Sequence, residues 1–331
     1  MRFRLRSLIA LAAAMVGFTA PAHSATSADV VRVGIIINPY AGDRAGPEQD
    51  EDAAAMLRGG LPELIVAAGA RIEDIQTVKL LAEDEKAYGR WNRFGLASGH
   101  LAGMASANEA AGVLNLGLYN NCGSLMGMLG GLRHSAPTPL RVGLVWIDAH
   151  GDYNTPETSL SGMLGGMPVA IAAGDGLSRM REQAGLEVPL PKENIIMVGV
   201  RDTDPLEQAR IEADGIPQVS TEDVRSLSAN LHGQMKRLSE ISDIVYVHVD
   251  LDVLDPAEVS GHPLTVPNGP TGAELGEAIR VMFEYPKTHA LGIASYPHTD
   301  DPGQLTLKAV HRMVEGAIRG LQNRATSPSA D

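Results

Sequence analysis

Two apolar segments, each followed at once by closely spaced acids, constrain the fold of this chain more than any other feature. Residues 141–147 and 244–249 have the length and apolar character of buried strands. Five acidic or imidazole side chains follow them at alternate positions: Asp148, His150, Asp152, Asp250 and Asp252. Because side chains two apart on an extended chain point the same way, each set is expected to share a face. Carboxylates gathered in this way would repel one another without a cation, so the pattern favours a metal site and metal-assisted hydrolysis.

The rest of the chain alternates between strand and helix patterns. Strands are predicted at residues 31–38, 113–119, 141–147, 194–200, 244–249 and 289–294. Helices are predicted at residues 52–58, 61–68, 96–111, 166–173, 204–213, 221–238, 271–283 and 306–321. This order indicates βαβ crossovers and a mainly parallel sheet, in which ligands bind beyond the carboxyl ends of the strands. The long loops 151–166 and 261–272 follow the acid-bearing strands and are expected to be functional.

The first 24 residues have the pattern of a secretory signal peptide. Arg2, Arg4 and Arg6 precede a short apolar stretch, and small residues surround the expected cleavage point near Ser24. An uncleaved N-terminal anchor is the alternative. We therefore expect a periplasmic or secreted protein whose residues 25–331 form a single α/β domain. Loss of the three arginines would change the formal charge from −13 to −16, which argues against binding to nucleic acid or to an anionic membrane.

The acidic segments and their surroundings resemble a known family. Residues 148–152 have the sequence DAHGD and are followed by NTPET at 154–158, and residues 250–256 have the sequence DLDVLDP. Weaker matches lie at residues 42–47, 198–202 and 296–300. In this order, the motifs resemble the arginase and agmatinase group, the ureohydrolases, over nearly the whole of the expected mature chain.

The resemblance implies a three-layer α/β/α sandwich with a central, mostly parallel sheet. It also implies two divalent metal ions, normally manganese, with a bridging hydroxide that attacks a carbon bearing nitrogen in a small cationic substrate. By this resemblance, Asp148, Asp152 and Asp250 would serve one ion. The other ion would be served by Asp148, His150, Asp250 and Asp252. Family members are often homo-oligomers, and the same is expected of this chain.

Cys122, the single cysteine, stands where the family has its first histidine metal ligand. A subgroup of ureohydrolase-like proteins has a Gly-Asn-Cys segment there and a later FLGGMP motif. This chain resembles that subgroup, with NNC at 120–122 and LGGMP at 164–168. A thiolate is a softer ligand than an imidazole and would shift the preference toward Zn²⁺ or a mixed site. The alternative is that Cys122 is a small buried residue beside an incomplete site.

Two further positions depart from the family pattern. Gly165 stands where arginase has a histidine that shuttles protons, and Ser295 stands where the family usually has a glutamate that pairs with the guanidinium of the substrate. His298 and His262 are the candidate general acids that could take over proton transfer. For each of them, an exposed loop histidine is the alternative. These departures weaken the case for arginine as the substrate but leave most of the metal site intact.

Three other side chains are candidates around the site. Asn154 matches the family position that contacts the amino-acid end of the substrate, although it could instead fix a turn. Glu157 is a candidate contact for a cationic substrate, with a solvated loop acid as the alternative. His248 has the same parity as Asp250, and it is either a hydrogen-bond partner of the site or a core histidine.

Three functional hypotheses follow. The first is a metallohydrolase that cleaves a C–N bond in a guanidino, amidino or related amide compound. The second is a catalytically inactive protein on the same scaffold that binds metal or a cationic metabolite. The third is a single-metal amide hydrolase, similar to the deacetylases, that uses Asp148, His150 and Asp250.

Overall fold

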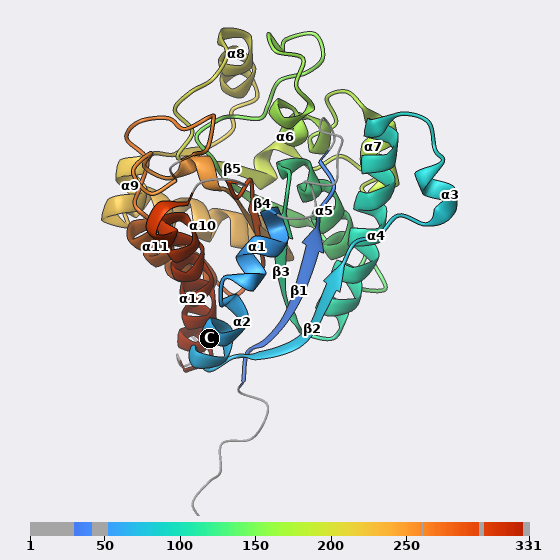
Figure 1. Cartoon of the computed structure of the whole chain (residues 1–331). Helices are drawn as coiled ribbons and strands as arrows, with labels where there is room; N and C mark the ends of the chain where they lie inside the picture. The colour runs from blue at the N-terminus through green and yellow to red at the C-terminus, as the bar shows by residue number, and fades with distance from the viewer. Residues whose placement is uncertain (1–29, 42–51, 260, 298–300, 327–331) are drawn as a thin grey trace, which may run out of the picture.

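The computed structural model describes residues 30–41, 52–259, 261–297 and 301–326 (Figure 1). Three features named from the sequence lie outside these residues. They are the expected signal peptide at 1–24, the weakly matching segment 42–47, and His298.

Within the described residues, eight strands form one sheet in the order β2-β1-β3-β8-β7-β4-β5-β6, and every neighbouring pair is parallel. The strands are β1 (Arg32–Asn38), β2 (Arg71–Thr77), β3 (Leu114–Tyr119), β4 (Val142–Ile147), β5 (Ile195–Val198), β6 (Gln218–Val219), β7 (Ile244–Asp250) and β8 (Thr288–Ala294). At least one helix lies between each strand and the next, as parallel pairing requires. All the carboxyl ends therefore meet at one edge of the sheet.

Helices cover both faces of the sheet. The first face is covered by α1 (Asp52–Arg58), α2 (Leu61–Ala67), α9 (Thr221–Ser226), α10 (Ala229–Ile241), α11 (Gly272–Glu284) and α12 (Leu305–Thr326). The second core includes side chains of α4 (Arg90–Ala110), α5 (Leu125–Arg133), α6 (Pro168–Ala172), α7 (Ser178–Gln183) and α8 (Pro205–Ala213). In Figure 1, α11 and α12 lie on one side of the strands and α4 and α5 on the other. The predicted three-layer α/β/α sandwich is confirmed.

The remaining helical segments are short. They are α3 (Ala82–Glu85) and the 3₁₀ turns η2 (Cys122–Ser124), η3 (Leu164–Gly166), η4 (Lys192–Asn194), η5 (Leu251–Val253) and η6 (Pro302–Gln304). Among the described residues, no helix combines the length and the apolar character needed to cross a lipid bilayer.

The single helix predicted at residues 221–238 is wrong. The structure has two helices there, because Leu227 adopts a left-handed backbone with a φ of 48°. Ser228 then caps the second helix, and its Oγ accepts hydrogen bonds from the backbone N–H groups of Asn230 at 3.1 Å and Leu231 at 3.3 Å. A serine before a new helix is a common start signal, but it was hidden here inside a continuous amphipathic pattern.

Helix α5 was missed because its sequence, LMGMLGGLR, contains three glycines, which disfavour a helix in isolation. The glycines instead allow close approach of neighbouring elements. A Cβ atom on Gly127 would lie 2.5 Å from the carbonyl oxygen of Ser98, and one on Gly131 would lie 2.5 Å from that of Ala102. Tertiary packing against α4 therefore overrides the low intrinsic propensity of this segment.

Gly130 provides a test of this packing. A Cβ atom there would lie 2.0 Å from the carbonyl oxygen of Ala184 at the end of α7. We expect Gly130→Ala to lower the free energy of unfolding by about 1–3 kcal/mol, because overpacking must displace backbone. The matched control is Gly233→Ala in α10, where nothing lies within 4 Å of the added Cβ. The control should be neutral or stabilising by about 0.5–1 kcal/mol. Urea denaturation measures both, and equal effects would contradict the packing argument.

Candidate metal centre

The candidate ligand side chains come from the carboxyl ends of three central strands. Asp148 follows β4 directly, Asp250 is the last residue of β7, and Cys122 begins the η2 turn shortly after β3. The sheet places β3, β8, β7 and β4 side by side. Residues more than a hundred positions apart in the sequence are therefore brought to one place at the edge of the sheet.

Short turns, rather than continued strand alternation, aim the side chains inward. The carboxylate of Asp250 accepts a hydrogen bond of 3.1 Å from the backbone N–H of Asp252 and so caps the η5 turn. In the same way, the carboxylate of Asp148 accepts one of 2.7 Å from the backbone N–H of His150. The expected convergence is present, but the chain leaves the extended conformation to produce it.

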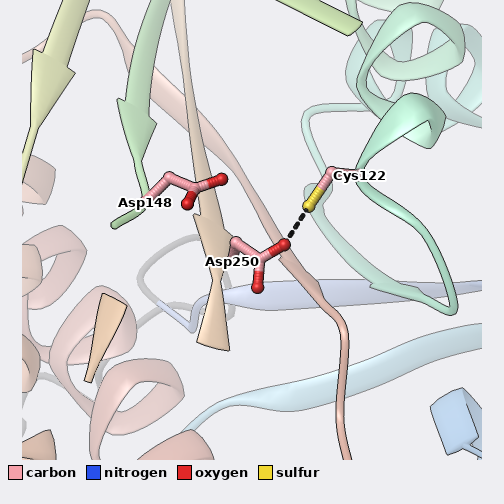
Figure 2. Close-up of side chains that lie close together, drawn as sticks. All are labelled: Cys122, Asp148 and Asp250. Carbon is pink, nitrogen blue, oxygen red and sulfur yellow. Dashed lines mark hydrogen bonds between the residues drawn. The ribbon is translucent and has the colours of Figure 1, made fainter. Parts of the chain in front are cut away.

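The potential ligand atoms form three sets, and within each set the atoms lie within 4.8 Å of one another. The sets are Cys122 with Asp148 and Asp250, Asp148 with His150 and Asp252, and Asp250 with Asp252 and His262. The Sγ of Cys122 lies 2.7 Å from Oδ2 of Asp250, and Figure 2 shows both side chains beside Asp148. Asp148, Asp250 and Asp252 each belong to two sets, so the three sets form one continuous cluster.

The cluster is removed from water. Only 1% of Asp148, 2% of Cys122 and 7% of Asp250 is exposed. Burial, followed by the nearby carboxylates, raises the pKa of Asp148 well above its usual value. Burial, followed by Asp250 and Asp148, also raises the pKa of the Cys122 thiol. Burial and Asp252 raise the pKa of Asp250. The cluster therefore resists carrying its full negative charge without a compensating cation.

His150 supplies part of that compensation. Its Nδ1 lies 3.1 Å from Oδ2 of Asp252 and 3.4 Å from Oδ1 of Asp148. Burial opposes the imidazolium form, but the hydrogen bonds to Asp148 and Asp252 outweigh it and raise the pKa of His150 to about 11. Burial likewise opposes ionisation of Asp252, while His150 lowers its pKa. A proton on His150 thus supplies positive charge beside Asp148 and Asp252.

The donor set fits divalent metal ions. Four buried carboxylates provide the hard oxygen ligands that Mn²⁺ prefers, and one imidazole and one thiol extend the fit toward Zn²⁺. The side chains that provide these donors are Cys122, Asp148, His150, Asp152, Asp250 and Asp252. Asp152 lies outside the three close sets, but it lines the same cavity, and burial followed by Asp250 raises its pKa.

Two residues of the cavity wall have a strained backbone. Asp152 has a φ of 46° and Ser295 a φ of 65°, and few residues other than glycine adopt this left-handed conformation. The hydroxyl of Ser295 donates to Oδ2 of Asp250 at 2.8 Å, and its oxygen lies 3.8 Å from the Sγ of Cys122. Strain of this kind is concentrated at functional sites. Ser295, which stands at the family position of the guanidinium-pairing glutamate, thus contacts the candidate metal-binding cluster.

His248 does not point into the cluster. Its ring stacks on Trp146 with centroids 4.7 Å apart, and its Nδ1 is 2.7 Å from the hydroxyl of Tyr246. Complete burial lowers its pKa to about 3, so the ring is neutral. Of the two alternatives left open by the sequence, the structure favours the core histidine.

A cavity of about 630 Å³ opens from the cluster. Its wall includes three acids that the sequence analysis did not single out: Asp202, Asp204 and Glu207. Asp204 and Glu207 form a capping box at the start of α8. Their sequence pattern is therefore explained by the helix start and does not indicate that they also line a cavity. Glu207 is buried and also accepts a hydrogen bond of 2.7 Å from the backbone N–H of Tyr153. The sequence pointed to Asp202 only through the weak resemblance of residues 198–202 to the ureohydrolase motifs.

The structure separates the other predicted contacts. Asn154 lines the cavity and donates from Nδ2 to Oδ2 of Asp204 at 3.1 Å. His262 also lines the cavity, close to Asp250 and Asp252. Glu157 is exposed in the turn after Thr155 and is not part of the cavity wall, so its predicted substrate contact has no support in this structure.

Comparisons with known proteins agree with this geometry. The model of the family described as "Arginase family" matches residues 40–318 of this chain. The arginase of Bacillus caldovelox is 34% identical over 146 residues, which are 44% of this chain and 49% of that protein. The arginase of Entamoeba histolytica is 31% identical over 186 residues, which are 56% of this chain and 61% of that protein. This chain therefore matches about half of the length of the first relative and about three fifths of the length of the second.

A solved structure shows the same fold over a greater length. The crystal structure of arginase from Bacillus subtilis superposes with a TM-score of 0.75 at 23% sequence identity. The superposition covers 87% of this chain and 98% of that chain.

A ligand role for Cys122 can be tested with cobalt. We expect the Co²⁺-loaded protein to show a near-ultraviolet thiolate-to-metal absorption band, because a thiol that binds metal does so as the thiolate. The band should be absent from Cys122→Ser and from Cys122→His, while Cys122→His should keep its metal content. Full cobalt binding by the unmodified protein without this band would contradict the prediction and favour a packing role for Cys122.

Metal binding should also release protons. His150, with a pKa of about 11, holds a proton at neutral pH in the metal-free protein, and a metal ion must displace it. We therefore expect the affinity for Mn²⁺ to rise with pH, with release of about one proton or more per chain at pH 7. Calorimetry in buffers of different ionisation enthalpy measures the release, and His150→Asn should reduce it. Heats that do not depend on the buffer would contradict this expectation.

Proposed function

This chain belongs to the arginase family, and we propose that it is a metal-dependent hydrolase that cleaves a C–N bond of a cationic guanidino or amidino compound. The observation that carries the proposal is the cluster of four buried carboxylates, one buried thiol and one partly buried imidazole at the floor of an acidic cavity. Such a donor set at the carboxyl edge of a parallel sheet supports a catalytic role rather than a structural one.

We assign the residues to two metal positions. Cys122, Asp148, Asp152 and Asp250 would hold one ion. Asp148, His150, Asp250 and Asp252 would hold the other. When bound, the ions supply the positive charge that these buried carboxylates require and lower the pKa of water enough to provide a nucleophile near neutral pH. In the net reaction, water oxygen forms the new bond to carbon, and the amine leaves with the proton that it needs.

We propose His262 as the source of that proton. The backbone N–H of Leu264 donates to its Nδ1 at 3.3 Å and orients the ring, and only the imidazolium form of this ring can act as the acid. The ring lines the cavity beside Asp250 and Asp252. It is therefore a better supported general acid than His298, which lies outside the described residues and stays a prediction.

The cavity wall favours a positively charged substrate. Asp202, Asp204 and Glu207 line it, and among the described lining residues there is no lysine or arginine. A guanidinium or amidinium ion would be attracted into this field, which low-dielectric walls concentrate. The proposal has three further parts. The resident metal is manganese, the protein is a homo-oligomer, and the segment 1–24 directs its export.

The proposal is tested by hydrolysis of a panel of arginine, agmatine, 4-guanidinobutanoate and simple amidines. We expect the Mn²⁺-loaded protein to release urea or an amine from at least one compound. Asp250→Ala should lower this activity to background, because Asp250 belongs to both metal positions. The matched control is Asp243→Ala. Asp243 pairs with Arg141 at the amino ends of β4 and β7, away from the cluster, so this variant should retain activity.

The metal content separates the alternatives. About two ions per chain together with hydrolysis supports the proposal, whereas one ion with hydrolysis favours the single-metal amide hydrolase. Metal binding without release from any compound would favour the inactive binding protein.

A further inference from the structure

Three large apolar side chains stand exposed around the outer part of the cavity. Leu160 is 79% exposed, Leu264 48% and Met163 42%, and all three line the same cavity as the buried metal-binding cluster. They come from the two loops that follow the acid-bearing strands β4 and β7. The cavity thus has a buried, charged floor, and these three side chains form the apolar part of its exposed mouth, which also includes Asp202.

Local hydrogen bonds hold the backbone of the two loops that carry these side chains. The hydroxyl oxygen of Ser159 accepts from the backbone N–H of Gly162 at 3.0 Å, and that of Ser161 accepts from the N–H of Met163 at 3.2 Å. On the other loop, the bond from the N–H of Leu264 to His262 fixes the leucine next to the proposed general acid. The apolar mouth is therefore partly organised before any ligand binds, which lowers the entropy lost on binding.

The mouth offers little to a carboxylate. No lysine or arginine occurs among the described residues that line the cavity. Asn154, which matches the family position for the amino-acid end of a substrate, is already engaged. It donates to Asp204, and its Oδ1 accepts a hydrogen bond of 2.9 Å from the hydroxyl of Thr158. A free carboxylate placed here would meet a wall of acids and exposed leucines.

We propose that Leu160, Met163 and Leu264 form a subsite for an apolar group, and that the substrate is a guanidino or amidino cation with an apolar substituent at the end away from the scissile bond. This inference rests on the proposed function for the position of the cationic end. Covering the three side chains removes exposed apolar surface from water, which is the main source of affinity for such a group. A free amino acid would gain none of this contact.

The test compares substrates that differ only at the far end: agmatine, 4-guanidinobutanoate and N-benzoylagmatine. We expect the kcat/KM of the Mn²⁺-loaded protein to be at least about tenfold higher for the benzoyl compound than for the other two. Leu264→Ser and Leu160→Ser should each reduce this ratio by about threefold to tenfold, and Leu264→Met should largely preserve it. Leu81→Ser, which changes a leucine that is 50% exposed but lies outside the cavity, should leave the ratio unchanged.

Binding measured by calorimetry separates the two proposals. If no compound is hydrolysed but N-benzoylagmatine binds more tightly than agmatine, and Leu264→Ser removes the difference, the hydrolase proposal fails while the subsite stands. Equal kcat/KM values, or a ratio that Leu264→Ser and Leu81→Ser change equally, would overturn the subsite. It would also be overturned if sedimentation showed a self-associated protein that Leu160→Ser converts to monomer, because a second copy would then cover the mouth.

Discussion

The carboxylates buried at one edge of the sheet are the constraint on which the rest of the structure depends. Asp148 and Asp250 carry charges that cannot be taken out of water alone, since the effective cost is several kcal/mol per uncompensated ion. The parallel order of β3, β8, β7 and β4 brings them together, and the η5 and η2 turns aim their neighbours at the same point. Hydrophobic burial elsewhere in two large cores stabilises a fold that holds these charges close together.

The strained loop after β4 is held by a network on its outer side. Asp152 has a left-handed backbone, a conformation that costs on the order of 1–3 kcal/mol, and the next residue is the fully buried Tyr153. The hydroxyl of Tyr153 donates to Asp214 at 2.8 Å, and the guanidinium of Arg210 lies 5.3 Å from its ring centroid. The ammonium of Lys192 binds the same Asp214 at 2.7 Å. These contacts fix the loop from behind, so the strain at Asp152 is not relieved by movement of its neighbour.

The sequence was sufficient for the layers and for the ends of the central strands, because continuous apolar runs identify buried parallel strands. It was insufficient where tertiary contacts override local preference. Helix α5 forms despite its glycines, and the exposed edge strand β2, with charged residues along its length, lacks the apolar pattern. At the site, five of the ligand candidates could be named from spacing alone. The wall acids Asp204 and Glu207 could not, since a capping box accounts for the same residues.

The departures from the family pattern have a common physical effect, which is to replace larger polar side chains with smaller ones. A Cβ atom on Gly165 would meet only Nδ2 of Asn121, at 3.7 Å, so packing does not require a glycine there and the space is open to a ligand. The hydroxyl of Ser295 donates a hydrogen bond to Asp250, and this position has no carboxylate to pair with a guanidinium. A site that loses a directional charged contact must obtain its selectivity from the field of its walls and from shape. In this cavity the field comes from Asp202 and its neighbours and the shape comes from the apolar mouth, so different side chains provide selection for charge and selection for size.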